Sequence, residues 1–255
     1  MDVDATLGQV GPGLGVGWRP RATIRRAVYA VSFMDVLGID VCAGSWLGVL
    51  SVDGRFVEAR LSDTVEGLLN DYSPDVAAID IPIGLVGTGW RACDLEARER
   101  LGKRRSSVFP IPPRAVVEAP TYDDANERCR AINGKGLSKQ AFAIFPTILE
   151  VDALVGGETR IVEVHPEVSF ATLAGAPLSK KKSWGGMKRR IELLDRVGLV
   201  LPHDLGGASE APPDDVLDAT VAAWSGARFL KGEAVRVGSD DGQRRGDGEP
   251  IAIWA

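Results

Sequence analysis

The sequence predicts an α/β domain built on a mixed sheet, and three patterns indicate it. Two extended runs within residues 45–61 are separated by Asp53-Gly54, a dipeptide typical of a tight hairpin turn. Apolar residues at helical spacing over 63–72 then lead into a nearly continuous apolar run over 75–84, as in a strand that is buried on both faces. A hairpin followed by a helix and a further strand builds a sheet with antiparallel and parallel pairs, joined by a helical crossover.

The remaining elements follow in order along the chain. A short apolar strand is expected over 36–40, before the hairpin. Residues 85–158 are more polar and include a helix over 91–102, so we expect a largely helical insertion around 85–158. Beyond it the patterns predict, in chain order, a strand over 160–170 ended by Pro166, amphipathic helices over 188–199 and 214–230, and a short last strand over 249–255.

Residues 1–33 differ from the rest of the chain. The segment is rich in Gly and Arg and has neither a strand nor a helix period, so we expect a flexible extension. We expect the ordered part to begin near Met34, which could be the true start of the protein. We therefore expect one domain over residues 34–255.

Composition excludes several classes of protein. With 255 residues and a formal net charge of −5, the chain is not a basic nucleic-acid coat protein, so any contact with nucleic acid must be local. Three cysteines with no C-x-x-C spacing fit a reducing compartment and neither a disulfide scaffold nor a zinc site. The acidic start and the lack of an apolar run of about 18 residues lead us to expect a cytoplasmic protein with no membrane segment.

Four aspartates lie at the ends of predicted elements. Asp40 ends the first strand, Asp80 ends the apolar run of the later strand, and Asp215 and Asp218 are neighbours on the first turns of the late helix. A charged carboxylate in an apolar strand is costly without a partner. Adjacent carboxylates also repel each other unless a cation lies between them, and hard cations such as Mg²⁺ prefer oxygen ligands. These residue types in this pattern therefore favour a metal site.

The same helix has simpler explanations for part of its charge. Asp214 follows Pro212-Pro213, and we expect it to be the N-cap. Asp215 alone could serve the helix dipole. Asp218 is harder to explain in this way, because it is followed by a largely apolar helix.

Five motifs occur in an order that resembles a known family. They are GIDVCAGSW, AIDIPIGL, RACDLEARERLGKRRSSVFPIPPR, EVHPEVSF and DDVLDATVAA. Together they resemble the domain-of-unknown-function family 429, described as predicted nucleases with a ribonuclease-H-like fold, from about Leu37 to Arg228. The resemblance implies a ribonuclease-H-like mixed sheet with flanking helices. In that wider superfamily, which includes the Holliday-junction resolvases, acids lie on strand one, on the fourth strand and as a D-x-x-D-A pair that opens the last helix.

This resemblance implies a role for each of the four aspartates. Asp40 is the first-strand acid and the natural bridging ligand, Asp80 is the fourth-strand acid, and Asp215 with Asp218 is the helix pair. The implied chemistry is hydrolysis of phosphodiester bonds in a nucleic acid or nucleotide, with two Mg²⁺ or Mn²⁺ ions roughly 4 Å apart.

The motif EVHPE adds Glu163 and His165, which are two residues apart on a predicted strand and so point to one face. In the functional interpretation Glu163 is a further metal ligand and His165 is a general base or proton shuttle. In the structural interpretation His165 is buried and neutral and orients the loop at Pro166. The resemblance favours function for Glu163 more than for His165.

Two basic clusters are candidates for contact with a phosphate-bearing substrate. Charge runs are usually solvated faces, and part of the first cluster could pair along its own helix. In the second cluster Trp184 offers a stacking surface and Gly185-Gly186 allow close backbone approach, so we favour the second. The candidates are Arg91, Arg98 and Arg105 in the first cluster and Lys181, Lys182 and Lys188 in the second.

A metal-dependent nuclease is therefore the expected function, and two alternatives stay open. The stretch DLGGAS (204–209) resembles a phosphate loop of sugar kinases and actin-like ATPases, although that architecture needs two copies of the fold and 255 residues is short for it. The other alternative is a non-catalytic module that binds a phosphorylated ligand or a protein, against which stands the presence of all four acids. Related resolvases are dimers, so a homodimer is also open.

Overall fold

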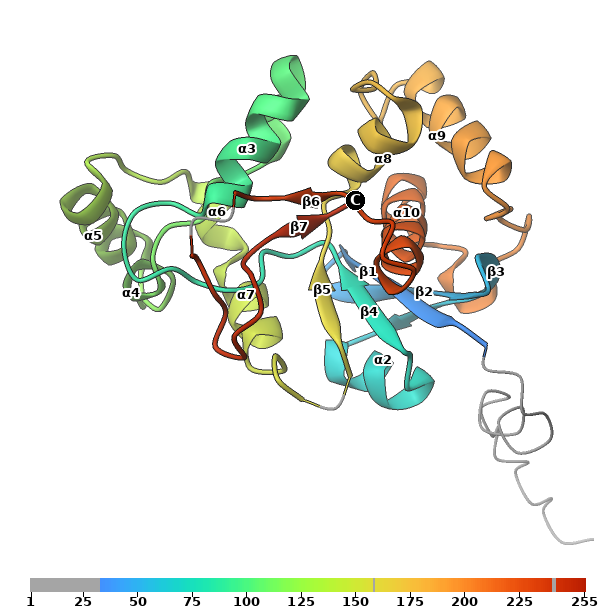
Figure 1. Cartoon of the computed structure of the whole chain (residues 1–255), viewed down its shortest axis with the longest axis horizontal. Coiled ribbons are helices and arrows are strands. Elements are labelled where there is room, and N and C mark those ends of the chain that lie inside the picture. The colour runs from blue at the N-terminus through green and yellow to red at the C-terminus, as the bar shows by residue number, and fades with distance from the viewer. Residues whose placement is uncertain (1–32, 158, 240–241) are drawn as a thin grey trace, which may run out of the picture. The chain divides into compact units, whose positions relative to one another are not determined.

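The computed structural model describes residues 33–157, 159–239 and 242–255. The predicted extension over 1–33 therefore lies outside the described residues, apart from its last position. The described chain forms a mixed α/β fold with helices on a five-stranded sheet, consistent with a ribonuclease-H-like fold, which confirms the predicted fold class (Figure 1).

The sheet has the strand order β3-β2-β1-β4-β5. Strands β1 (Asp35–Cys42), β2 (Ser45–Val52) and β3 (Arg55–Ser62) form an antiparallel meander. Strand β4 (Val76–Ile79) then pairs parallel with β1, and β5 (Ile161–Glu163) pairs parallel with β4. The sheet is therefore antiparallel on one side of β1 and parallel on the other.

The predicted hairpin turn is present between β2 and β3. Asp53 and Gly54 both adopt positive φ, 51° and 76°. Two successive residues of this kind match the right-handed twist of the flanking strands, which is why Asp-Gly is favoured there. Helix α2 (Val65–Tyr72) follows, with the Thr64 side chain accepting a hydrogen bond from the Gly67 N–H as its N-cap.

The two faces of the sheet are covered by different parts of the chain. Helix α10 (Pro213–Leu230) packs across β1, β2 and β4 on one face. On the other face, the largest apolar cluster joins Leu37 and Ile39 of β1 to Leu68 of α2 and Ile148 of the insertion. The alternation of side chains along β1 therefore sends Gly38 and Asp40 toward α10.

The insertion between β4 and β5 is largely helical, as predicted. In chain order it contains α3 (Ala92–Leu101), the 3₁₀ turn η1 (Gly102–Ser107), α4 (Arg114–Val117), α5 (Tyr122–Asn133), α6 (Lys139–Ala143) and α7 (Phe145–Asp152). Figure 1 shows α4, α5 and α6 at the left of the view, away from α8 and α9, whereas α3 packs against α8.

The predicted strand over 160–170 is wrong in its second half. Strand β5 ends at Glu163, and Pro166 begins helix α8 (Pro166–Ala174) instead of merely ending a strand. Proline has no N–H and its fixed φ suits the first helical position, where that N–H would be unpaired in any case. His165 is the N-cap residue of α8, but its side chain makes no capping hydrogen bond.

Three further elements complete the fold. Helix α9 (Trp184–Arg196) begins four residues before the predicted start, because Ser183 caps it. The stretch 204–209 forms the short 3₁₀ turn η2 (Gly206–Ala208) and no hairpin. The last residues pair as β7 (Ile253–Trp254) with β6 (Arg236–Val237) in a separate two-stranded sheet. Within the described ranges, none of the helices combines the length and the apolar character that crossing a membrane requires.

Candidate functional site

The parallel pairing of the sheet brings Asp40 and Asp80 to the same edge. Ile39 of β1 is in register with Ile79 of β4, and the Asp80 N–H donates to the Ile39 carbonyl at 2.9 Å. Ile79 is in turn in register with Glu163 of β5. The carboxyl ends of parallel strands are where α/β sheets commonly place ligands, so these registers set the position of the candidate site.

Helix α10 brings its aspartates to this edge because a glycine lets it approach the sheet closely. A Cβ built on Gly38 would lie 2.0 Å from the Ala219 carbonyl oxygen, so the helix backbone occupies the space that any other residue would need. Gly38 lies two residues before Asp40 on the same face of β1, and Ala219 follows Asp218 on the helix. This contact therefore sets Asp218 beside Asp40.

The four predicted aspartates Asp40, Asp80, Asp215 and Asp218 lie close enough to perturb one another, and we call them the acid site. Burial raises the pKa of Asp40 well above its usual range, and the charges of the other three raise it further. Burial likewise raises the pKa of Asp218 to about 7 and raises the pKa values of Asp80 and Asp215. Four desolvated carboxylates of like charge favour either protons or a cation.

Lys181 supplies a cation to the acid site from the segment before α9. Its Nζ lies 2.5 Å from Asp218 Oδ2 and 3.3 Å from Asp214 Oδ2. These carboxylates raise the pKa of Lys181 against the effect of its burial. Asp214 is therefore an ion-pair partner and not the predicted N-cap: the N-cap position of α10 is Pro212, which has no side-chain capping bond.

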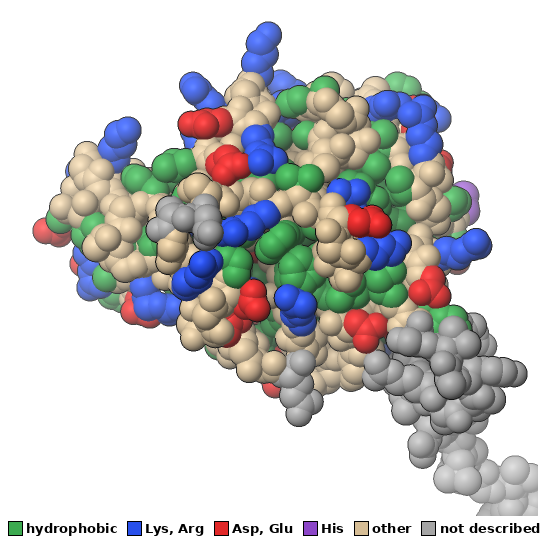
Figure 2. Space-filling view, viewed as in Figure 1, with side chains coloured by type: hydrophobic (Ala, Val, Ile, Leu, Met, Phe, Trp, Pro, Cys, Tyr) green, Lys and Arg blue, Asp and Glu red, His purple; other side chains and the backbone are tan. Residues whose placement is uncertain are grey.

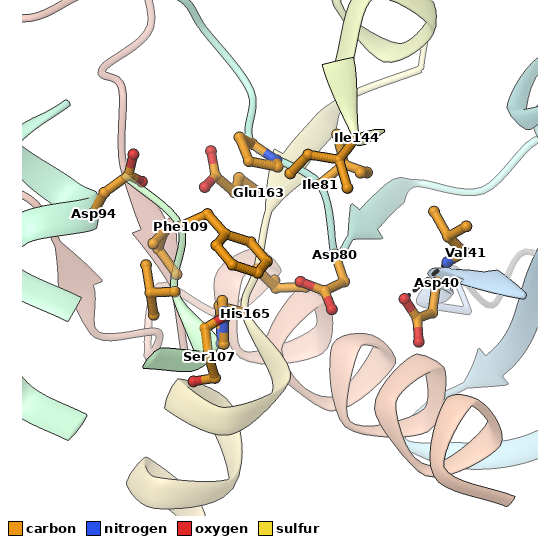
Figure 3. A pocket seen from close by; sticks show the side chains of 14 residues that line it. Asp40, Val41, Asp80, Ile81, Asp94, Ser107, Phe109, Ile144, Glu163 and His165 are labelled. Atoms are coloured by element: carbon orange, nitrogen blue, oxygen red, sulfur yellow. Dashed lines mark hydrogen bonds between the residues drawn. The ribbon is translucent and has the colours of Figure 1, made fainter. Parts of the chain in front are cut away.

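A cavity of about 220 Å³ opens beside these residues. Asp40 and Asp80 line it together with His165, Ser107 and Phe109. Figure 3 shows the carboxylates of Asp40 and Asp80 facing the same space, with His165 near Ser107 and the Phe109 ring beside them. His165 Nε2 lies 3.2 Å from the Ser107 carbonyl oxygen, whereas its Nδ1 is buried without a hydrogen-bond partner in the described part of the chain.

Glu163 lies on the wall of the same cavity, but its carboxylate is paired within a second group of residues. Arg91, which is 0% exposed, forms a buried ion pair with Glu163 Oε2, and the Ile83 N–H donates to the same oxygen at 2.6 Å. Asp94 accepts a bond from the Ile111 N–H at 2.8 Å and lies 3.7 Å from the Arg91 guanidinium. We call Arg91, Cys93, Asp94 and Glu163 the inner cluster.

The inner cluster has metal-like spacing, but an arginine already serves as its cation. Ligand atoms of Cys93, Asp94 and Glu163 all lie within 4.8 Å of one another. Arg91 Nη2 lies 3.1 Å from Cys93 Sγ as well as bonding Glu163. Burial raises the pKa of Glu163 to about 8, and the Arg91 charge opposes that rise. The geometry therefore gives Glu163 a structural partner in Arg91, and its role as a metal ligand stays a prediction.

The predicted substrate-contact residues differ in whether their side chains are accessible to a substrate. Arg91 has no exposed surface to offer a substrate, and Arg98 Nη1 donates to the carbonyls of Arg105 and Val108 at 2.9 and 2.6 Å, which fixes the end of η1. The other candidates face solvent or the acid site: Arg105 and Lys188 are exposed, Lys181 bonds Asp218, and the exposed Lys182 lies 3.7 Å from Asp214.

Sequence reasoning missed Glu167 and Arg190. Glu167, in the first turn of α8, is buried, and its charge raises the pKa values of Asp80 and Asp218. Both of its oxygens accept bonds from Arg190 Nη2 at 3.0 Å, and Arg104 Nη2 lies 3.1 Å from Oε1. The available signal was the last residue of EVHPE, Glu167, which continues the series of Glu163 and His165 at every second position. An acidic residue in the first turn of a helix is normally explained by its favourable interaction with the helix dipole, so Glu167 did not stand out.

Taken together, the fold and the acid site define an α/β protein that gathers carboxylates at the carboxyl ends of parallel strands. A family model for proteins of unknown function, DUF429, matches residues 38–242, and the chain belongs to this family. No curated protein and no solved structure matches the chain. The family match covers both the acid site and the inner cluster.

Proposed function

We propose that the protein is a metal-dependent nuclease of the ribonuclease-H-like superfamily, which hydrolyses phosphodiester bonds of a nucleic acid or nucleotide. The observation that carries the proposal is the convergence of Asp40 of β1, Asp80 after β4, and Asp215 and Asp218 of α10, with Asp40 and Asp80 lining an open cavity. The motif order that resembles predicted nucleases supports the same chemistry.

The residues of the acid site offer the donor chemistry that Mg²⁺ or Mn²⁺ prefers. All four offer carboxylate oxygens, which are the ligands that hard divalent cations prefer. Lys181 Nζ lies 2.5 Å from Asp218 Oδ2, and this positive charge beside one of the carboxylates supports the proposal. When bound, such ions supply an activated water and stabilise charge on a phosphoryl group.

The chain's own residues would then have distinct tasks. Asp40 is central, because its carboxylate is affected by the charges of the three other aspartates and of Lys181. His165 lines the cavity, and its Nδ1 has no hydrogen-bond partner among the described residues, so this side chain would hold or move a proton of the reacting groups. Lys182 is placed to neutralise phosphate charge at the exposed side of the site.

A reducing compartment such as the cytoplasm fits this proposal. All three cysteines, Cys42, Cys93 and Cys129, are buried free thiols. Such thiols persist where glutathione and thioredoxin keep them reduced.

Calorimetric titration with Mn²⁺ and Mg²⁺ tests the proposal. Wild-type protein should bind, and Asp40→Asn should lose binding, because the variant removes the central carboxylate charge. Asp123→Asn, which changes an exposed aspartate of α5, is the matched control and should bind like wild type.

The outcome decides between the two classes of function. Binding that Asp40→Asn abolishes should be accompanied by a fall of at least about a thousandfold in Mg²⁺-dependent cleavage of DNA or RNA, since the ions supply several kcal/mol of transition-state stabilisation. Equal binding by wild type and Asp40→Asn would contradict the acid site. No binding by either protein would favour the non-catalytic binding module.

A further inference from the structure

We propose that the segment 179–186, which we call the lysine loop, binds a single-stranded stretch of nucleic acid, with Trp184 stacking on an unpaired base. The inference deepens the proposed function by naming the substrate class. It rests on that function only in assuming that the bound strand is cleaved at the acid site. Four observations lead to it.

The lysine loop is a compact, hydrogen-bonded structure. The Ser183 N–H and hydroxyl both donate to the Lys180 carbonyl, at 3.0 and 2.7 Å, and the Gly186 N–H donates to Ser183 Oγ at 3.2 Å. A Cβ on Gly186 would lie 2.0 Å from the Lys180 carbonyl oxygen, so only glycine fits there. The loop therefore has one defined shape.

A buried arginine fixes both ends of the loop to the body of the protein. Arg190 is 0% exposed, and its Nη1 donates to the carbonyls of Ser179 and Gly186 at 3.1 and 3.0 Å. Its Nη2 bonds both oxygens of Glu167 at the start of α8, and its guanidinium lies over the Phe170 ring. Charge-assisted bonds of this kind are stronger than hydrogen bonds between neutral groups.

The loop lies beside the acid site. Lys181 reaches from the loop to Asp218 and Asp214. Trp184 follows three residues later, so its Cα lies within about 11 Å of the Lys181 Cα along the chain. A nucleic-acid strand whose scissile phosphate lies at the acid site would therefore have a neighbouring nucleotide within reach of Trp184.

Trp184 and the lysines around it are exposed. Trp184 is 74% exposed, the most exposed large apolar residue of the described chain, and the Lys182 side chain is 81% exposed. Lys180 and Lys188 are exposed on either side of this pair. Figure 2 shows Lys and Arg side chains, with acidic side chains beside them, where Figure 1 places α9.

This combination of side chains matches a single strand better than a duplex. An exposed indole stacks on the free face of an unpaired base, and neighbouring lysines contact the phosphates. Bases of a duplex are already stacked on each other, so they offer Trp184 no free face. Because the protein carries a net charge of −5, a polyanion needs such a local basic surface to approach the acid site.

Fluorescence anisotropy with a labelled DNA strand of about 12 nucleotides, and with its duplex, tests the inference in the presence of EDTA. Wild type should bind the single strand more tightly than the duplex. Trp184→Ala should weaken single-strand binding about tenfold, and Trp184→Phe should restore most of it, because phenylalanine keeps a stacking face. Ile132→Ala, which removes an exposed apolar side chain from α5, is the control and should bind like wild type.

Two results would overturn the inference. One is single-strand binding by Trp184→Ala that equals wild type; the other is no binding of either oligonucleotide by the wild-type chain. Failure of the proposed function looks different, because Mn²⁺ titration of Trp184→Ala should match wild type whatever its affinity for DNA. Loss of single-strand binding in Trp184→Ala, together with unchanged Mn²⁺ binding in Asp40→Asn, would support the lysine loop and reject the metal site.

Discussion

The acid site and the inner cluster are two groups of largely buried carboxylates that each contribute residues to one cavity, but they are neutralised in different ways. In the inner cluster the cation is Arg91, which is completely buried. In the acid site the nearest cation is Lys181, whose side chain is 31% exposed and comes from the lysine loop. Figure 3 shows members of both groups, with Asp94 and Glu163 at one end and Asp40 at the other.

The carboxylates also differ in what their remaining bonds do. Glu163 and Asp94 accept backbone N–H groups from Ile83 and Ile111, so the inner cluster holds two loops of the chain in place. Asp40 accepts a bond from the adjacent Val41 N–H, and its pKa is raised by its fellow aspartates. The inner cluster therefore has the features of a structural ion pair, and the acid site has those of a site that can exchange its cation.

Removing Arg91 should have the largest effect on stability. Arg91→Met leaves Glu163 and Asp94 buried without their cation, and breaking a buried pair in this way costs about 3–5 kcal/mol of unfolding free energy. Urea denaturation measures the loss. Arg100→Met on α3, the helix that follows Arg91, removes an exposed ion pair with Glu96; it is the control and should cost under about 1 kcal/mol. Equal losses in the two variants would mean that the inner cluster is not a structural core.

The acid site should instead make stability depend on pH. The pKa of Asp218 is about 7 in the folded state, against an ordinary value of 3.8. Between about pH 4 and pH 7 the folded protein keeps a proton that the unfolded chain releases, so the contribution of Asp218 to stability falls as pH rises through this range. Below about pH 4 both states hold the proton and the contribution no longer changes.

Asp218→Asn removes this ionisation while keeping the shape of the side chain. The difference in unfolding free energy between Asp218→Asn and wild type should therefore increase as pH rises from 4 to 8. The increase should be on the order of 3 kcal/mol, at about 1.4 kcal/mol per pKa unit. Denaturant unfolding at several pH values measures the gain. Parallel curves for the two proteins would show that Asp218 is ionised throughout, and the contrast with the inner cluster would then disappear.

Much of the fold could be predicted from the sequence because its signals are local. Asp53-Gly54 adopts the positive φ angles that its turn requires. Apolar runs predicted the strands that carry the acids, although β1 continues two residues beyond Asp40 and only Asp80 lies directly after its strand. The segment that begins at Pro166 could not be predicted with the same certainty, because a proline is compatible both with the end of a strand and with the first position of a helix. Whether the residues after Pro166 form a strand or a helix depends on how this segment packs against the rest of the fold.

The partners of the buried charges could not be predicted, because they depend on contacts between distant parts of the chain. Arg91 and Glu163 are 72 positions apart in the sequence, and nothing near either residue indicates the other. Arg91 therefore looked like a substrate contact and Glu163 like a metal ligand. Gly38 did carry a local signal, since a glycine inside a strand often marks close backbone approach. The roles of the four aspartates in catalysis stay predictions.

Replacing Lys181 should have the smallest effect and is the sharpest test of an exchangeable cation. Lys181→Met keeps most of the apolar stem but removes the ammonium group from the oxygens of Asp214 and Asp218. If a divalent ion competes for the same oxygens, Mn²⁺ affinity measured by calorimetry should rise about tenfold, the effect of one nearby unit charge in a partly solvated site. Lys182→Met, which removes a more distant ammonium group, should change the affinity less than about twofold.

The direction of the change in Lys181→Met matters more than its size. A rise in Mn²⁺ affinity means that the lysine loop supplies a temporary cation, which a metal ion displaces. A fall means that Lys181 orients the aspartates for the metal, as Arg91 fixes Glu163, and the two groups of acids would then be neutralised by the same kind of permanent ion pair. Arg91→Met provides the reference at the other end of the cavity, since removing a cation that has no access to solvent should leave Mn²⁺ affinity unimproved.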